Sequence, residues 1–337
     1  MHSSILQTPL PDGRIRCNVC QWRCELAPGE RGRCRVREHQ EQTIALTSYG
    51  QISAATIGPI EDQRLWHFFP DAQALSIGGF GTPITAGAGL RTASAFSEPS
   101  PAARKLDPER AVLFAQQRLC RGILWAFGDP AVNAEWVLDG LKISRAASRF
   151  NAIATTGYFN PEVFAQMTPY LDGMRLDIFG FSSQSYHELS GLDDWRTIFK
   201  NAAEARQKWN IHIEVALYLT PGVNDSDAEI TALSKWMRVA LGSLTPLHIL
   251  GDQIDEATLH RVQSAARSAG IQFVYGPAAA QSTRCPTCTW VVIERSEGPT
   301  QLTGVVDDVC ESCHMPLGLR TSLFRRNVRY EMPTSVT

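Results

Sequence analysis

From residue 74 onward, two patterns of apolar and polar positions alternate along the chain. Short apolar runs predict β-strands, and segments with apolar positions three and four residues apart predict helices. The predicted strands are Ala74–Gly79, Gly122–Phe127, Asn151–Thr156, Gly173–Phe179, Ile211–Leu219, Leu244–Leu250 and a shorter Ile271–Tyr275. The predicted helices are Val132–Ser148, Pro161–Tyr170, Trp195–Trp209, Asp227–Leu241 and Asp255–Ala269.

Strand and helix in alternation indicate right-handed βαβ units and a parallel sheet that is buried on both faces. Five or six such units in about 200 residues favour an α/β fold built as a partial (β/α) barrel, with chemistry at the carboxyl ends of the strands. Two segments interrupt this pattern. Residues 79–103 predict a long loop after the first strand, and residues 276–284 predict a linker.

Composition places the chain among ordinary globular proteins. It has 337 residues, 44% of them hydrophobic and 20% charged, and its net charge of -2 gives no bulk attraction to nucleic acid or to an anionic membrane. Arginines crowd the segment from Arg14 to Arg37, but acidic residues lie among them, which favours a solvated mixed-charge surface over a nucleic-acid patch. No signal peptide and no apolar run long enough to span a bilayer is present, so we expect a cytoplasmic protein.

Eight of the nine cysteines fall into two terminal clusters. The pairs Cys285-x2-Cys288 and Cys310-x2-Cys313 are typical of two knuckles that hold Zn²⁺ tetrahedrally. Four thiolates leave no open position on the ion, so the predicted role is structural. The alternative is four thiols without metal. His314 directly follows the last cysteine, but adjacent residues rarely bind one ion together.

The second cluster comprises Cys17, Cys20, Cys24 and Cys34. We expect zinc here as well, although the spacing of the first three thiols is also compatible with a [4Fe–4S] cluster. So short a Cys-rich segment buries little core by itself and needs a metal to stabilise it.

These observations divide the chain into four parts. Residues 10–72 are expected to form an N-terminal Cys-rich unit and connector, in which the aromatic Trp66–Phe69 segment packs that unit onto the barrel. Residues 73–278 form the barrel, residues 279–320 a zinc-ribbon-like unit, and residues 321–337 a tail.

Ordered motifs along residues 10–318 resemble the radical-SAM proteins of the AmmeMemoRadiSam system. They begin with Leu10-Pro-Asp-Gly-Arg and the N-terminal cysteines. The later ones are Ser48-Tyr-Gly50, Gly58-Pro-Ile-Glu61, Leu65-Trp-His-Phe-Phe-Pro70, Leu75-Ser-Ile-Gly78, Thr155-Thr-Gly-Tyr158, Asp177 with Gly180-Phe181, Ser190-Gly191, Pro221-Gly-Val-Asn-Asp-Ser226 and the C-terminal cysteine pairs. The resemblance implies a partial barrel of radical-SAM type with small Cys-rich metal-binding units at both termini.

In that family the loop after the first barrel strand carries a CxxxCxxC motif. Its three thiolates hold a [4Fe–4S] cluster whose fourth iron binds S-adenosylmethionine (SAM). The corresponding positions here are Thr82, Ala86 and Gly89, none of which can bind iron. The family's Asn-Glu-Pro after the second strand reads Gly128-Asp129-Pro130, and its lysine after Asp177 is replaced by Phe179.

The mouth of the expected barrel still carries polar and small residues that a small ligand such as SAM could contact: Gly78, Gly79, Asp129, Thr156, Asp177 and His248. Asp129 could accept hydrogen bonds from an amine, or it could cap a helix that starts at Pro130. His248 is more often a hydrogen-bonded core histidine than a base. Asp177 could instead cap the turn at Gly180 and Phe181.

Three functions remain open. The first is a pseudoenzyme that keeps its structural metal and acts as a partner or regulatory subunit, for which the resemblance implies another protein of the same system as the partner. The second is an enzyme that binds SAM or another nucleotide and performs non-radical chemistry, although Cys120, the only spare thiol, is expected on the wrong side of the barrel. The third is a radical-SAM enzyme whose cluster has moved to the N-terminal cysteines.

Overall fold

The structure is a computed structural model that describes residues 2–85, 99, 102–295 and 298–323. Its centre is an eight-stranded sheet in the order β13-β12-β11-β10-β9-β8-β7-β6. Strands β7 to β13 are parallel, and β6 joins the edge antiparallel to β7. The strands are β6 (Ala54–Pro59), β7 (Gln73–Gly78), β8 (Gly122–Trp125), β9 (Phe150–Thr155), β10 (Gly173–Ile178), β11 (His212–Tyr218), β12 (Leu247–Leu250) and β13 (Val274–Tyr275). The seven strands predicted from the sequence are therefore β7 to β13.

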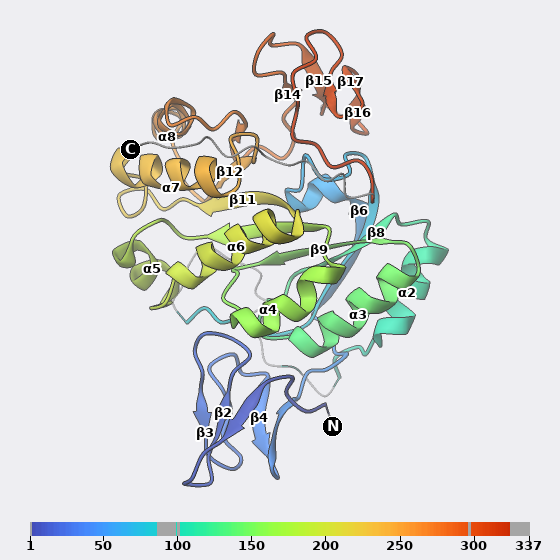
Figure 1. The fold of residues 1–337 in the computed structure, drawn as a ribbon, viewed down its shortest axis with the longest axis vertical. Helices are drawn as coiled ribbons and strands as arrows, with labels where there is room; N and C mark the ends of the chain where they lie inside the picture. The colour runs from blue at the N-terminus through green and yellow to red at the C-terminus, as the bar shows by residue number, and fades with distance from the viewer. Residues whose placement is uncertain (1, 86–98, 100–101, 296–297, 324–337) are drawn as a thin grey trace.

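Helices follow most of these strands and cover one face of the sheet (Figure 1). They are α2 (Pro108–Gln117), α3 (Ala134–Ala146), α4 (Pro161–Met167), α5 (Ser183–Ser190), α6 (Arg196–Trp209), α7 (Asp227–Ala240) and α8 (Glu256–Ser268), with 3-10 turns η1 (Ile60–Gln63) and η2 (Thr168–Tyr170). Side-chain caps start several of them: Ser226 accepts the amide of Glu229 at α7, and Asp255 accepts that of Thr258 at α8. Helices α2 and α5 were not predicted.

Alternating residues along the strands divide the core into two parts, as the two-residue period of a strand requires. Leu75, Ile77 and Leu176 lie in the cluster shared with the helices. Ala74, Leu124, Ala152 and Ala154 lie on the opposite face, where they pack against the segment that joins η1 to β7.

The Trp66–Phe69 segment fills this second face of the sheet. Phe69 stacks with Phe150, Phe68 contacts the same ring edge to face, and Trp66 contacts His248 edge to face. The prediction that these aromatic residues pack the N-terminal unit onto the barrel is wrong. They lie between the sheet and the C-terminal unit because the chain passes under the sheet on its way from β6 to β7. β6 is itself part of the eight-stranded sheet, and η1 follows it directly.

Two small units lie at opposite ends of the sheet (Figure 1). The N-terminal unit contains the sheet β1-β2-β3 (Gln7–Pro9, Ile15–Cys17, Glu25–Leu26) and the hairpin β4-β5 (Arg37–Gln40, Thr43–Leu46). The C-terminal unit contains β14-β15-β16 (Thr283–Arg284, Val291–Glu294, Gln301–Leu302) and the hairpin β17-β18 (Val305–Val306, Val309–Cys310). Of the helices in the described residues, none is both long and apolar enough to cross a bilayer.

Candidate functional site

The carboxyl ends of β7, β8 and β9 meet at Asp129. Its Oδ1 accepts hydrogen bonds from the amide of Ala131 at 2.9 Å and the hydroxyl of Thr155 at 2.7 Å. Its Oδ2 accepts from the amide and the hydroxyl of Thr156 at 3.0 and 2.6 Å. Four donors occupy the lone pairs of a carboxylate, so little capacity is left for a ligand amine. Asp129 instead joins the end of β9 to the turn after β8. The alternative that Asp129 caps a helix starting at Pro130 is wrong, because residues 130–132 form a turn and α3 begins only at Ala134, with Asn133 in the N-cap position.

Steric packing explains why residues 78 and 79 are glycines, without any ligand. A Cβ built on Gly78 would lie 1.4 Å from the carbonyl oxygen of Ala126, and one on Gly79 would lie 3.0 Å from Oδ1 of Asn133. The chain after β7 therefore passes directly against the chain after β8, which only glycine allows at residue 78. These two predicted cofactor-binding residues serve close backbone packing.

The loop after β7 is held in place through residue 85. The carbonyl of Phe80 accepts from the side-chain amide of Asn133, and the carbonyl of Gly81 accepts from the amide of Asp129. The indole N–H of Trp22 donates to the carbonyl of Pro83 at 2.7 Å. Thr82 is buried, and its hydroxyl accepts the amide of Ile84.

This loop does not fit a [4Fe–4S] cluster. Residues 79–85 contain no thiol, imidazole or carboxylate, and Thr82 already uses its hydroxyl within the loop. Ala86 and Gly89 lie outside the described residues, and neither residue type carries a metal ligand. No step of radical chemistry can be derived from this donor set.

Asp177 forms a buried ion pair near the end of β10. Both its oxygens accept hydrogen bonds from Arg175, at 2.7 Å from Nε and 3.0 Å from Nη2. Burial raises the pKa of Asp177, and the guanidinium opposes this rise. The predicted cap of the following turn is wrong: Glu229 accepts the amide of Phe181 there, because α7 places its carboxylate beside that turn.

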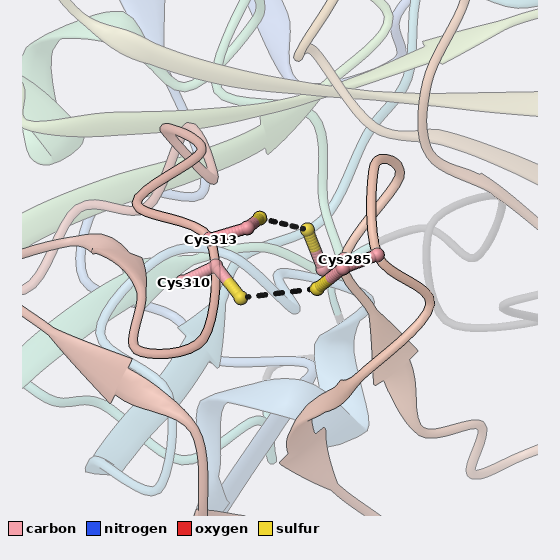
Figure 2. Close-up of side chains that lie close together, drawn as sticks. Cys285, Cys310 and Cys313 are labelled. Atoms are coloured by element: carbon pink, nitrogen blue, oxygen red, sulfur yellow. Dashed lines mark hydrogen bonds between the residues drawn. The ribbon is translucent and has the colours of Figure 1, made fainter.

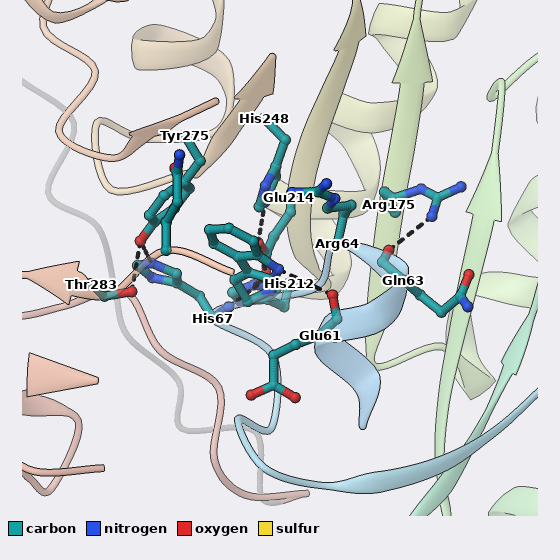
Figure 3. A network of polar contacts seen from close by, with 12 residues as sticks. Glu61, Gln63, Arg64, His67, Arg175, His212, Glu214, His248, Tyr275 and Thr283 are labelled. Carbon is teal, nitrogen blue, oxygen red and sulfur yellow. Dashed lines mark hydrogen bonds and ion pairs between the residues drawn. The ribbon is translucent and has the colours of Figure 1, made fainter. Parts of the chain in front are cut away.

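Glu214 is the centre of a second buried network (Figure 3). Oε1 accepts from the amide of His67 at 2.7 Å and faces Nε2 of His212 at 3.1 Å. Oε2 accepts from the amide of Trp66 at 3.0 Å and faces Nε2 of His248 at 2.8 Å. His248 is fully buried, so the structure places it as a hydrogen-bonded core histidine and not as an exposed base.

The network continues toward the C-terminal unit. His67 contacts the hydroxyl of Tyr275 at 2.8 Å, and that hydroxyl contacts Thr283 at 2.8 Å. Burial lowers the pKa of His67 to about 3 and also lowers the pKa values of His212 and His248. Burial alone would raise the pKa of Glu214, but the hydrogen bonds from the two histidines hold it well below its usual range. The network joins β11 and β12 to the aromatic segment, and each oxygen of Glu214 has two partners within it.

Sequence reasoning missed Glu214 and Arg175. Each is a charged residue inside an otherwise apolar strand run, which is the signal that could have identified them, because a buried charge requires a partner. The partners of Glu214 come from three separate segments, so the pattern could not name them.

The C-terminal cysteines form a candidate metal centre (Figure 2). The four Sγ atoms of Cys285, Cys288, Cys310 and Cys313 all lie within 4.8 Å of one another. The Sγ atoms of Cys285 and Cys313 are 3.5 Å apart, and those of Cys288 and Cys310 are 3.6 Å apart. Thiolates of a tetrahedral zinc site lie about 3.8 Å apart at a Zn–S length of about 2.3 Å, so the residues fit such an ion. This centre lies at the amino-terminal side of the strands, where Gly318 packs on Leu244 before β12.

The N-terminal cysteines lie near the carboxyl ends of the strands. Cys20 forms a β-bridge with Phe159, just after β9, and the carbonyl of Cys34 lies beside Gly81 in the loop after β7. Cys17, Cys20 and Cys34 are buried, and burial raises their pKa values, that of Cys34 to about 11. Among the described residues only the C-terminal four gather three or more donor atoms within 4.8 Å, so metal binding by the N-terminal four stays a prediction.

Comparisons with known proteins extend this picture. No family model matches the chain. It is 27% identical over 323 residues to the uncharacterized protein MJ0808 of Methanocaldococcus jannaschii, covering 88% of this chain and 92% of that protein. It is 25% identical over 116 residues to a 4-hydroxyphenylacetate decarboxylase activating enzyme of Clostridium scatologenes, and the match covers 34% of this chain and 37% of that enzyme. It is 27% identical over 135 residues to an isethionate sulfite-lyase activating enzyme of Nitratidesulfovibrio vulgaris, covering 39% and 44%.

Among solved structures, a radical SAM methyltransferase from Sphaerobacter thermophilus aligns with a TM-score of 0.49 and 15% identity, covering 66% of this chain and 70% of that one. The similarity to the activating enzymes supports a relationship to the radical SAM superfamily. The chain thus combines this relationship with a loop that lacks the ligands of a cluster.

Proposed function

We propose that this protein is a radical-SAM-like pseudoenzyme of the AmmeMemoRadiSam type, a partial barrel that binds structural metal and does not cleave SAM. The observation that carries the proposal is the loop after β7. It has no ligand for iron in residues 79–85, and its carbonyl groups are occupied by Asn133, Asp129 and Trp22.

The neighbouring carboxylate supports the same proposal. A residue that binds the amino group of SAM needs free lone pairs, whereas the four hydrogen bonds to Asp129 come from the protein itself. Zinc at the four C-terminal cysteines fits their spacing and would stabilise the fold without chemistry. A protein of this kind acts through contacts, and we infer that it is the partner or regulatory subunit of another protein of its system.

A second function has one observation in its favour. The N-terminal cysteines lie at the carboxyl ends of β7 and β9, the edge at which a radical-SAM cluster would be needed. A four-iron cube holds its thiolates farther apart than a single ion does, and among the described residues the N-terminal cysteines do not gather three sulfurs within 4.8 Å, so a relocated cluster is compatible with them.

Anaerobic reconstitution separates the two functions. The purified protein is treated with iron and sulfide, and visible and EPR spectra are recorded with and without SAM, together with an assay for 5′-deoxyadenosine. The pseudoenzyme yields about two zinc ions per chain, no SAM-dependent EPR signal and no 5′-deoxyadenosine. A [4Fe–4S] signal that SAM perturbs, and that is lost in Cys20→Ser but kept in Cys120→Ser, would overturn the proposal and establish the relocated cluster.

A further inference from the structure

A groove lies on the helical side of the molecule, between α6 and α7 and beside the start of α5 (Figure 1 shows these helices next to one another). Its volume is about 680 Å³, within the range of small-molecule sites. None of the residues discussed above as cofactor or metal ligands lines it.

Aromatic rings form the walls of this groove. The ring of Phe199 lies 4.8 Å from that of Phe181 and 4.7 Å from that of Trp236, at interplanar angles of 84° and 85°. Two of the residues that line the groove, Ala203 on α6 and Ala232 on α7, have small side chains, which leave space between the rings. Flat apolar walls of this kind suit an aromatic ring, which can add a further edge-to-face contact.

The rim of the groove is positively charged. Arg196 and Lys200 are one turn apart on α6, and both are exposed. The guanidinium of Arg196 lies 4.6 Å from the ring centroid of Trp195, which holds it at the rim. No carboxylate lines the groove, and within the described part of the chain none lies within 4.0 Å of either cation.

The nearby Glu229 on α7 does not offset this charge by binding the two cations. Its Oε1 accepts the amide of Phe181 at 2.6 Å, and its Oε2 accepts the hydroxyl of Ser185 at 2.9 Å. The groove therefore offers an apolar slot with two cations that have no partner carboxylate, and its complement is a molecule with a flat ring and a negative group.

We propose that this groove binds a small aromatic anion, with its ring against Phe181, Phe199 and Trp236 and its negative group on Arg196 and Lys200. The proposal is independent of whether the protein cleaves SAM, because it uses neither the loop after β7 nor the cysteines. It adds a ligand site to a protein for which we otherwise propose structural metal alone.

The test uses the whole purified chain and three probes: indole-3-acetate, the neutral indole-3-acetamide and acetate. Calorimetry and saturation-transfer NMR are expected to show binding of indole-3-acetate, about tenfold weaker binding of the amide and no binding of acetate. The double variant Arg196→Gln/Lys200→Gln should weaken indole-3-acetate binding about tenfold and leave the amide unchanged. The matched control is Lys208→Gln on the same helix, since that lysine pairs with Glu204 away from the groove.

Blocking the slot gives a second measurement. Ala232→Leu should abolish binding of both indole ligands while the folded spectrum is retained. Three results would each overturn the proposal. They are equal affinity for the acid and the amide, equal affinity of the double variant and the unmodified protein for indole-3-acetate, and no binding of either indole at millimolar concentration.

Discussion

Single buried carboxylates hold this molecule together at points where the chain itself supplies every donor. Glu214 and Asp129 each accept four hydrogen bonds, one from a residue two positions away and three from segments farther along the chain. A buried carboxylate without partners would be strongly destabilising, so each one fixes the geometry of the elements around it. At the residue scale, these two carboxylates therefore serve structure.

The histidines around Glu214 make stability depend on pH. The unfolded chain titrates histidine near pH 6.5, whereas the folded pKa of His67 is about 3 and those of His212 and His248 are lowered. Between the two values the unfolded state binds more protons, so its free energy falls relative to the folded state as the pH falls. The contribution of these histidines is complete above about pH 6.5, and the low pKa of Glu214 adds a further loss below about pH 4.3.

We expect the free energy of unfolding to decrease from pH 6.5 to pH 4, by up to about 1.4 kcal/mol per pH unit for each histidine. Urea unfolding at a series of pH values measures this slope. In His248→Gln the side-chain amide can still donate to Glu214 but cannot titrate, so the slope should become shallower. His187→Gln, on the surface, should leave it unchanged. A flat profile between pH 6.5 and pH 5 in the unmodified protein would contradict this account.

At the scale of elements, the C-terminal ribbon depends on its cysteines. Its strands contain only two to four residues, and its apolar cluster is shared with Trp66 and Phe273 of the main body. Such short strands need an additional constraint, and metal coordination supplies one. The two knuckles are joined through the sulfurs of all four cysteines.

Cys310→Ser is expected to remove about one metal ion per chain and to lower the melting temperature, because three thiolates hold the ion less tightly than four. Elemental analysis and thermal unfolding measure the two effects. The matched control is Cys120→Ser, a buried cysteine outside both clusters, which should keep its metal content. Identical metal content in the Cys310 variant would show that these thiols do not hold the ion.

At the scale of the whole molecule, a buried ion pair fastens the N-terminal unit to the sheet. Arg37 pairs with Glu135 in the first turn of α3 and also donates to the carbonyl of Val132. Glu135 in turn accepts the amide of Ile5. The pair joins the N-terminal unit to the carboxyl-end edge of the sheet, close to the loop after β7.

Removing one partner of this ion pair should destabilise the N-terminal unit more than replacing both charged residues by neutral ones. Arg37→Met leaves Glu135 buried without its partner and is expected to cost about 3–5 kcal/mol, whereas Arg37→Met/Glu135→Gln should recover part of this loss. Hydrogen exchange of residues 2–50 and chemical unfolding measure both variants. Arg31→Ala, which breaks the exposed pair with Glu38, should cost less than about 1 kcal/mol. Equal losses in all three variants would exclude the proposed fastening role.

The prediction of elements from the sequence succeeded where periodicity was strong. Strands β7 to β13 and helices α3, α4, α6, α7 and α8 were predicted close to their observed limits, since their apolar positions face a large core. Helix α5 was missed because it is short and polar, and its start depends on the Ser182 cap. The start of helix α2 could not be predicted because the helix follows a long segment of small residues.

The candidate site was predictable only in part. The four C-terminal cysteines were predicted from their spacing, because a pair of cysteines separated by two residues can place both thiolates on one ion. Asp129 and Asp177 were predicted to lie at the mouth of the barrel, but neither their burial nor their partners were foreseen. Thr155 and Thr156 reach Asp129 from another strand, and a pattern along one chain carries no information about neighbours across a sheet.

The amino-acid sequence by itself determined the succession of strands and helices, the two cysteine clusters and the absence of thiols at Thr82, Ala86 and Gly89, since each follows from local residue types and spacing. Tertiary structure decided which polar groups are already occupied and which edge of the sheet each cysteine cluster occupies. These depend on contacts between residues that are far apart in the chain, such as Trp66 with Glu214, 148 positions apart, and Arg37 with Glu135, 98 positions apart. Only folding brings such groups within hydrogen-bonding distance, and so only the folded chain shows that Asp129 and Glu214 already have four hydrogen-bond partners each.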